Sequence, residues 1–271
     1  MVQAYSCKKE YGISTILFGQ MDLYSALKSI ADFGFESAEL WADNIHFDTR
    51  TGIDIKLVRK WLKELKMTAH SVHAPFTNFK KTGDVQKDRK FRQEILLKTI
   101  DACSDLPVPI MVVHGLDRIE YNYMANEVDI VRDSLAELCE YGRKQGVMIA
   151  LENLTPGKGD TESELRCRLR DFTQYFFGIG LKYCLDIGHA VLNGSDIFDE
   201  IDAAGKDLIT FHVHNNDGQG DNHNIPSKGV INWPVIYDYA RSKGFTDTFI
   251  LEPCFSTEPL LTMKDIASLF N

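Results

Sequence analysis

The sequence predicts a single (β/α)8 barrel, the TIM-barrel fold of the α/β class, from three observations. The chain has 271 residues, close to the roughly 250 residues typical of one such barrel. Short β-rich segments alternate with helix-length amphipathic segments from one end to the other, as in a parallel sheet covered by helices. No linker or change of composition interrupts this alternation, so we expect one domain over residues 1–271.

Eight segments have the composition of buried strands. They are almost continuously apolar, which is typical of strands covered on both faces. In chain order, the expected strands are Tyr11–Phe18, Ser37–Trp41, Thr68–Pro75, Pro109–Gly115, Val147–Asn153, Leu181–Ile187, Leu208–His214 and Thr248–Pro253.

A helix is expected after each strand. The helical spacing of apolar residues is clear in the second helix, where Leu57, Trp61 and Leu65 lie on one face. The expected helices are Met21–Phe33, Ile53–Met67, Asp88–Leu106, Asn126–Lys144, Glu162–Tyr175, Ile197–Ala204, Trp233–Lys243 and Leu260–Phe270.

Metal-competent side chains gather where the strands end. In a closed parallel barrel these ends converge on one face, where the active sites of barrel enzymes lie. Imidazole and carboxylate groups suit zinc, manganese, iron or cobalt, and burying so many charges is prohibitive unless cations neutralise them. The candidate residues are His73, His114, Glu152, Asp186, His189, His212, His214, Asp221, His223 and Glu252.

Each of these residues also has an ordinary structural interpretation. A single strand-end histidine is more often a hydrogen-bonded structural residue, and Asp186 could cap the next helix. Glu152 and Glu252 could be salt-bridge partners. The metal site is favoured because six consecutive strands end in a ligand-type residue. Glu39, in the second strand, could contact a substrate or brace His73, and the sequence leaves both open.

Composition and charge narrow the class of protein. The net charge of −9 argues against a broad nucleic-acid-binding surface. Residues 1–10 lack the apolar run of a secretory signal, and no stretch reaches the ~20 apolar residues of a membrane span. Six scattered cysteines without a CxxC pair indicate reduced thiols. We therefore expect a cytoplasmic protein with a small-molecule partner and no membrane association; the sequence leaves homo-oligomerisation open.

The phrases SVHAPF, VVHG, ALEN, CLDIGHA, FHVHNND, DNH, KGVINW and ILEP carry a resemblance to a known family. Over nearly its whole length the chain resembles the xylose isomerase-like barrel superfamily, which contains sugar and sugar phosphate isomerases and epimerases, inosose dehydratase-like proteins and endonuclease IV. In the epimerase branch, the resemblance implies a core metal site of Glu152, Asp186, His212 and Glu252.

The choice of His212 over His214 follows the family phrase H-x-H-D-N, in which the first histidine is the ligand. Here Asn215 replaces the usual aspartate, so His214 stays an alternative. His189 matches a histidine that contacts substrate in epimerases, and His214 is a further candidate for substrate binding. Lys158 and Lys228 are candidates for holding a phosphate group.

The resemblance to endonuclease IV implies up to three metal ions at nine matching positions. However, this chain has HGLD and TPGKG where the repair enzymes carry HPGS-like and TAGQG-like segments. We therefore expect one to three divalent ions per chain, zinc or manganese, with cobalt or magnesium as alternatives. The nine positions are His73, His114, Glu152, Asp186, His189, His212, Asp221, His223 and Glu252.

The resulting prediction is a metal-dependent isomerase or epimerase acting on a sugar, a sugar phosphate or a related polyol. The metal would stabilise an enediolate as a Lewis acid, and Glu152 and Glu252 would remove and return the proton. Two alternatives stay open: phosphodiester hydrolysis at a multinuclear zinc site, and water elimination by an inosose dehydratase-like lyase.

Overall fold

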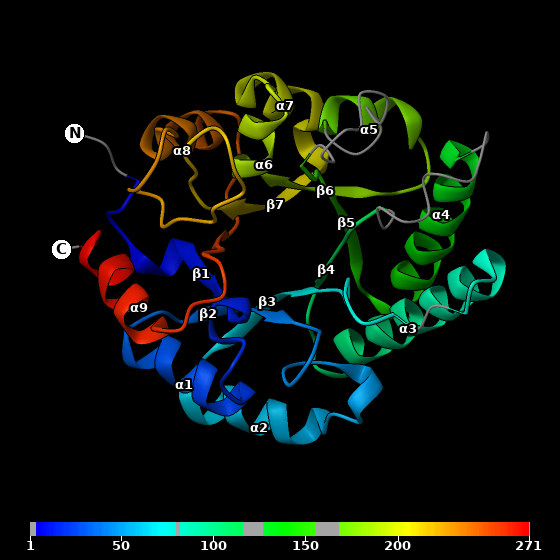
Figure 1. The fold of residues 1–271 in the computed structure, drawn as a ribbon, viewed down its shortest axis with the longest axis horizontal. Coiled ribbons are helices and arrows are strands. Elements are labelled where there is room, and N and C mark those ends of the chain that lie inside the picture. Colours follow the sequence, from blue (N-terminus) through cyan, green and yellow to red (C-terminus); the bar gives the residue numbers. More distant parts are fainter. Residues whose placement is uncertain (1–3, 80–81, 116–126, 156–167, 271) are drawn as a thin grey trace.

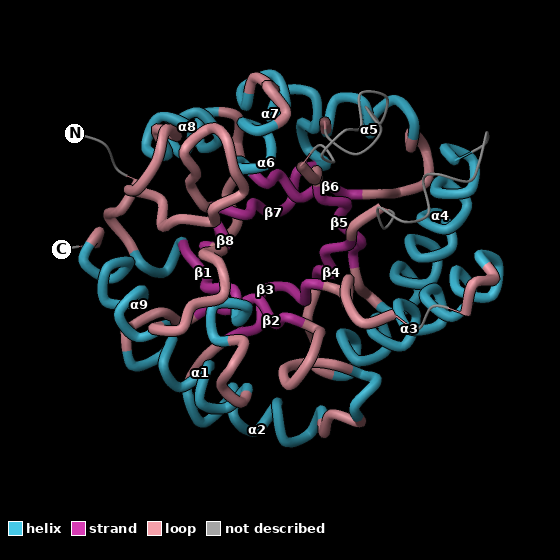
Figure 2. The backbone as a smooth tube through the Cα atoms, in the orientation of Figure 1, coloured by secondary structure: helices cyan, strands magenta, loops and turns pink. Residues whose placement is uncertain are grey.

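The computed structural model describes residues 4–79, 82–115, 127–155 and 168–270, and these residues form a closed parallel barrel. Neighbours in the sequence are neighbours in the sheet, and β1 closes the ring by pairing with β8 (Figure 2). The predicted fold class is confirmed. The strands are β1 Tyr11–Ser14, β2 Ser37–Trp41, β3 Thr68–His73, β4 Ile110–Val113, β5 Met148–Glu152, β6 Lys182–Asp186, β7 Leu208–Val213 and β8 Phe249–Leu251.

Helices form an outer ring around the strands (Figure 1). Several begin at an aspartate whose carboxylate accepts backbone N–H groups of the first turn, as Asp22, Asp54, Asp84 and Asp196 do. The described residues form α1 Leu23–Asp32, α2 Ile55–Leu65, α3 Val85–Asp105, α4 Glu127–Gln145, α5 Leu169–Tyr175, α6 Ile187–Leu192, α7 Ile197–Ala204, α8 Trp233–Ser242 and α9 Pro259–Ser268.

Three local features differ from the expected elements. The first strand ends at Ser14, because Thr15–Phe18 turns into a 3-10 helix that buries Leu17 and Phe18 in the core. α5 begins at Leu169 after an extended Arg168, although residues 162–167 of that expected helix lie outside the described part. The short helix α6 was not expected; it begins directly at Asp186, which caps it.

The inside of the barrel changes character along its axis. Ile110, Val112, Ala150 and Cys184 form a small apolar cluster of strand side chains, separate from the main core. Toward the C-terminal strand ends, the fully buried side chains include charged and polar ones, such as Asp186 and His212. The apolar cluster and a buried polar site thus both belong to the barrel strands.

Two further expectations concern disulfides and membrane-spanning helices. The five described cysteines are free thiols. Within the described ranges, no helix has the length and apolar character needed to cross a membrane.

Candidate metal centre

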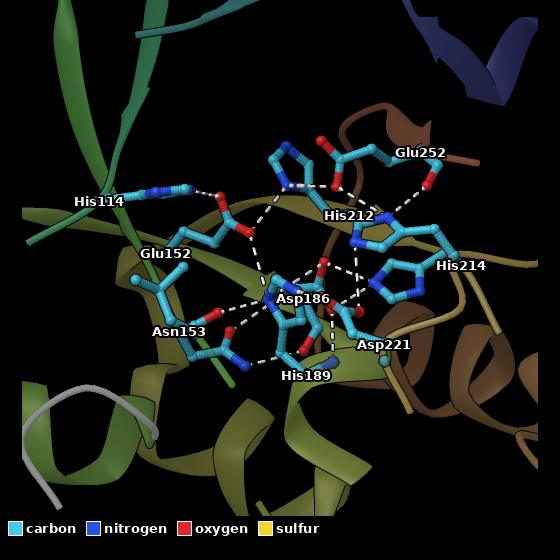
Figure 3. Close-up of polar contacts among 12 residues, drawn as sticks. His114, Glu152, Asn153, Asp186, His189, His212, His214, Asp221 and Glu252 are labelled. Atoms are coloured by element: carbon cyan, nitrogen blue, oxygen red, sulfur yellow. Dashed lines mark hydrogen bonds and ion pairs between the residues drawn. The ribbon is translucent and has the colours of Figure 1, made fainter. Parts of the chain in front are cut away.

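Four residues from consecutive strands meet at the C-terminal mouth of the barrel. Glu152 and Asp186 end β5 and β6, His212 lies near the end of β7, and Glu252 directly follows β8. Each offers a ligand atom within 4.8 Å of the others, and none is more than 3% exposed. We call these four residues the core cluster (Figure 3). The core metal set inferred from the sequence is thus brought together.

Glu152 is the centre of this arrangement. Its Oε2 lies 3.2 Å from His73 Nε2 and 3.4 Å from His114 Nε2. Its Oε1 lies 3.4 Å from both His189 Nδ1 and His212 Nδ1. One buried carboxylate therefore faces four imidazoles, which were dispersed over more than half of the sequence.

The core cluster fits a divalent cation. Glu152 Oε2 and His212 Nδ1 are buried, and no described residue meets hydrogen-bond geometry with them, although oppositely charged groups lie 3.2–3.4 Å away. Such unsatisfied buried atoms are costly, and both are potential ligand atoms. Three buried carboxylates with an imidazole also form the kind of donor set that binds zinc or manganese. Residues Glu152, Asp186, His212 and Glu252 would hold the ion.

Protonation in the metal-free protein reflects the crowding of these charges. Burial opposes the charged form of His212, but surrounding acidic groups hold its pKa well above the usual value. Burial raises the pKa of Glu252 to about 7. The positive charge of His212 opposes this rise, and the negative charge of Glu152 adds to it. Because a metal requires deprotonated ligands, its binding would displace protons from this network.

A second group of ligand-type side chains lies beside the first. It consists of His189, His214, Asp221 and His223, whose candidate ligand atoms also lie within 4.8 Å of one another. Asp221 contacts His189 Nε2 at 3.3 Å and His223 Nε2 at 3.2 Å. The rings of His214 and His223 stack at 3.7 Å. We call these residues the outer cluster.

Asp186 joins the two clusters. Its carboxylate lies 2.9 Å from His214 Nε2 and accepts the backbone N–H of His189 at 2.7 Å. His212, in contrast, faces Glu152 and Glu252 (Figure 3). The two histidines of the HVH phrase therefore lie in different clusters, His212 in the core cluster and His214 in the outer one.

Two residues that the sequence analysis did not single out shape the site. The Asn153 side chain donates to the Asp186 carbonyl and accepts its N–H, both at 2.8 Å, which ties β5 to β6. At Gly188, an added Cβ would lie 2.0 Å from His214 Cε1. The sequence offered one indication of each residue, its place next to a candidate ligand: Asn153 follows Glu152, and Gly188 precedes His189.

The mouth also has an apolar wall. The ring of Phe76 lies 4.9 Å from that of His73 and 4.8 Å from that of His114, measured between centroids. Phe76 is partly exposed, so it offers an apolar surface beside the ligands on the β3 and β4 side.

The structure describes one of the two predicted phosphate-binding lysines, Lys228. Lys158 lies outside the described residues. Lys228 is exposed, and its Nζ lies 3.0 Å from Asp265 on α9. To bind a substrate phosphate, Lys228 would first have to leave this ion pair.

Comparisons with known proteins agree with this architecture. The profile of the family described as xylose isomerase-like TIM barrel matches residues 27–270. The chain belongs to this family. Its relatives include fructoselysine 3-epimerase of Escherichia coli O157:H7, which is 23% identical over 272 residues that cover 96% of each chain. The uncharacterized protein MJ1311 of Methanocaldococcus jannaschii is 24% identical over 250 residues, 90% of this chain and 83% of the relative.

Solved structures share the fold. A D-tagatose 3-epimerase-like protein has a TM-score of 0.79 at 21% identity. D-psicose 3-epimerase from Clostridium cellulolyticum H10, solved with D-tagatose, has a TM-score of 0.75 at 17% identity. In each case 96% of both chains is covered. Sugar epimerases are therefore among the proteins similar to this chain, in sequence and in fold.

Proposed function

We propose that the protein is a divalent-metal-dependent epimerase or isomerase of a sugar, a sugar phosphate or a related polyol. One observation carries this proposal: two buried carboxylates, Glu152 and Glu252, face the same nitrogen, His212 Nδ1, at 3.4 and 3.3 Å. Epimerisation needs one group to remove a proton and another to return it on the opposite face. Two carboxylates that converge on one candidate metal ligand would flank a substrate bound to the ion, and one could remove the proton while the other returns it.

A divalent ion bound by the core cluster would supply Lewis-acid stabilisation of the negative charge that develops on a hydroxy-ketone when its C–H proton is removed. Glu152 and Glu252 would remove and return that proton. His189 and His214 would contact substrate hydroxyl groups, and Lys158 and Lys228 would bind a phosphate if the substrate carries one. The proposal includes zinc or manganese as the resident ion, with cobalt or magnesium as alternatives, and a cytoplasmic location.

Proton exchange tests this proposal directly. The purified protein, stripped of metal and loaded with Mn²⁺, Co²⁺ or Zn²⁺, would be incubated with a panel of ketoses and ketose phosphates in heavy water. We expect metal-dependent incorporation of deuterium next to the carbonyl of at least one substrate. Glu152→Gln should lower the exchange rate about 10²–10⁴-fold, the usual contribution of a positioned acid–base group.

The matched control is Glu200→Gln, because Glu200 is 2% exposed but lies on α7, outside both clusters. It should exchange at the wild-type rate. The proposal fails if the loaded protein exchanges no C–H proton in the panel, or if Glu152→Gln is as active as the wild type.

The outer cluster favours a second candidate function, phosphodiester hydrolysis at a multinuclear zinc site. With metal in both clusters, the protein could bind a phosphate group between neighbouring cations. Elemental analysis and an abasic-site DNA duplex distinguish the two functions. About three zinc ions per chain together with strand incision would favour hydrolysis; one ion without incision would exclude it.

A further inference from the structure

Glu39 is a buried carboxylate that the proposed chemistry does not use. It is the third residue of β2 and has no exposed surface. Its Oε2 accepts a hydrogen bond from Ser71 Oγ at 2.8 Å and lies 3.1 Å from His212 Nε2. The sequence left open whether Glu39 contacts substrate or braces His73; its hydrogen bonds among the described residues go to Ser71 and His212.

The two nitrogens of His212 face different partners. Nε2 faces Glu39, whereas Nδ1 faces Glu152 and Glu252, which belong to the core cluster. A neutral imidazole carries one N–H and one lone pair, and an ionised carboxylate can only accept. If Glu39 is ionised, the proton of His212 lies on Nε2 and the lone pair of Nδ1 points at the core cluster.

A purely structural role for Glu39 would cost folding free energy in these surroundings. Its other oxygen, Oε1, is buried without a hydrogen-bond partner in the described part of the chain. A buried carboxylate with an unsatisfied oxygen costs free energy unless a cation compensates its charge. Once His212 is a neutral ligand, a metal ion on the far side of its ring would provide that compensation through the imidazole.

We propose that Glu39 is a positioning residue of the metal centre: it holds His212 in the tautomer that presents Nδ1 to the ion and makes that nitrogen a stronger ligand. Carboxylates that accept the free N–H of a ligating histidine commonly have this effect, and their loss typically lowers metal affinity about 10–100-fold. Ser71 fixes the orientation of the carboxylate. This inference rests on the proposed metal centre.

Metal affinity provides the test, independently of activity. Competition between the metal-free protein and a chromophoric chelator would give the Co²⁺ affinity of the wild type, Glu39→Gln, Glu39→Ala and Glu200→Gln. We expect Glu39→Ala to bind Co²⁺ about 10–100-fold more weakly. Glu39→Gln should lie between it and the wild type, because its amide oxygen still accepts from Nε2 but has lost the charge. Glu200→Gln should bind like the wild type.

A second measurement reads the tautomer itself. In ¹⁵N-histidine-labelled protein loaded with diamagnetic Zn²⁺, the His212 signal, assigned by its loss in His212→Gln, should show the proton on Nε2. The role of Glu39 would be overturned if the wild type binds Co²⁺ and the folded variants Glu39→Gln and Glu39→Ala bind it with the same affinity. A His212 proton on Nδ1 in the Zn²⁺-loaded protein would overturn it as well. If the wild type binds no metal, the proposed metal centre itself fails. Should Glu39→Ala not fold, Glu39→Gln and the tautomer still decide the question.

Discussion

The core and outer clusters use the same two kinds of side chain on different supports. The core residues belong to strand ends and are at most 3% exposed. The outer cluster includes Asp221 and His223 on the loop after β7, whose side chains are 38% and 19% exposed. Side chains on strands are held more precisely than side chains on loops. The comparison indicates that Asp221 and His223 are the adaptable half of the outer cluster, whereas His189 and His214 are buried, as the core residues are.

The two clusters are nevertheless joined by direct contacts. Asp186 belongs to the core cluster, yet it contacts His214 and caps the helix that carries His189. Glu152 reaches His189 as well. We therefore expect damage to the core cluster to spread to the outer one, and damage to the outer cluster to leave the core largely intact.

The largest expected effect comes from Asp186→Asn compared with Asp221→Asn. Asparagine at 186 can still cap α6, but it removes the charge that both clusters share. Loss of a group that only hydrogen-bonds a metal ligand typically lowers metal affinity about 10–100-fold. Loss of the Asp186 charge, which belongs to a direct ligand, should therefore lower it more than ~100-fold. Asp221→Asn should reduce metal binding at the outer cluster only. Metal content per chain, measured with both variants in parallel, checks this, and equal losses would contradict the division into two clusters.

Gly188→Ala should disturb the outer cluster by displacing the His214 ring. The new Cβ would lie 2.0 Å from His214 Cε1 and 2.5 Å from its Nδ1, so the ring must move. Overpacking of this kind costs about 1–3 kcal/mol of folding free energy. Denaturant unfolding of the metal-free protein measures this cost, and metal content per chain shows whether the outer site is lost.

Gly115→Ala is the matched control for this variant. Its Cβ would meet Leu151 Cδ1 at 3.5 Å, an ordinary contact, and no closer atom of a described residue. If both alanine variants behave alike, the close fit between Gly188 and His214 does not organise the cluster.

The outer cluster should also respond to pH in the metal-free protein. Burial opposes the charged form of His223, but its hydrogen bond to Asp221 raises the His223 pKa from 6.5 to about 9. A raised pKa stabilises the fold fully below pH 6.5, and this stabilisation is lost as the pH rises through about 9. The melting temperature of the metal-free protein should therefore fall between these pH values.

Metal should reverse this dependence, because protons and metal compete for the same imidazole. Affinity at the outer cluster should rise over the same pH interval. In Asp221→Asn both trends should become weaker, since the partner that raises the pKa of His223 has lost its charge. A metal-free melting temperature that rises toward pH 9 in the wild type would count against this account.

The smallest expected effect is that of Lys228→Met. The ion pair of Lys228 with Asp265 is exposed, and such pairs contribute about 0–1 kcal/mol to stability. With an uncharged sugar, KM should stay at its wild-type value, because Lys228 would have no phosphate to contact. A much larger rise in KM for the phosphorylated sugar alone would support the predicted phosphate contact, and equal KM values for both substrates would remove it.

The sequence predicted much of the fold because two of its signals are local. Apolar segments of strand length recur with helices between them, and the structure places a strand in each of the eight expected segments. The boundaries were less predictable. Thr15–Phe18 has a strand-like composition but forms a 3-10 helix. α6 has only six residues, too few for a helical pattern, and its one sequence signal is Asp186, which accepts the backbone N–H of His189 as the N-cap.

What the sequence determined by itself was the closed barrel and the set of ligand-type residues at its mouth. The resemblance already assigned His212 to the core set; the tertiary structure decided that His214 lies with Asp221 in a second cluster and that Asp186 joins the two. Pairing registers shift where Glu39 meets Ser71 and where Cys184 meets Thr210. Such a shift changes which side chains face the interior. The partners of Glu39 and His212 therefore depend on contacts across the closed sheet, which no local pattern contains.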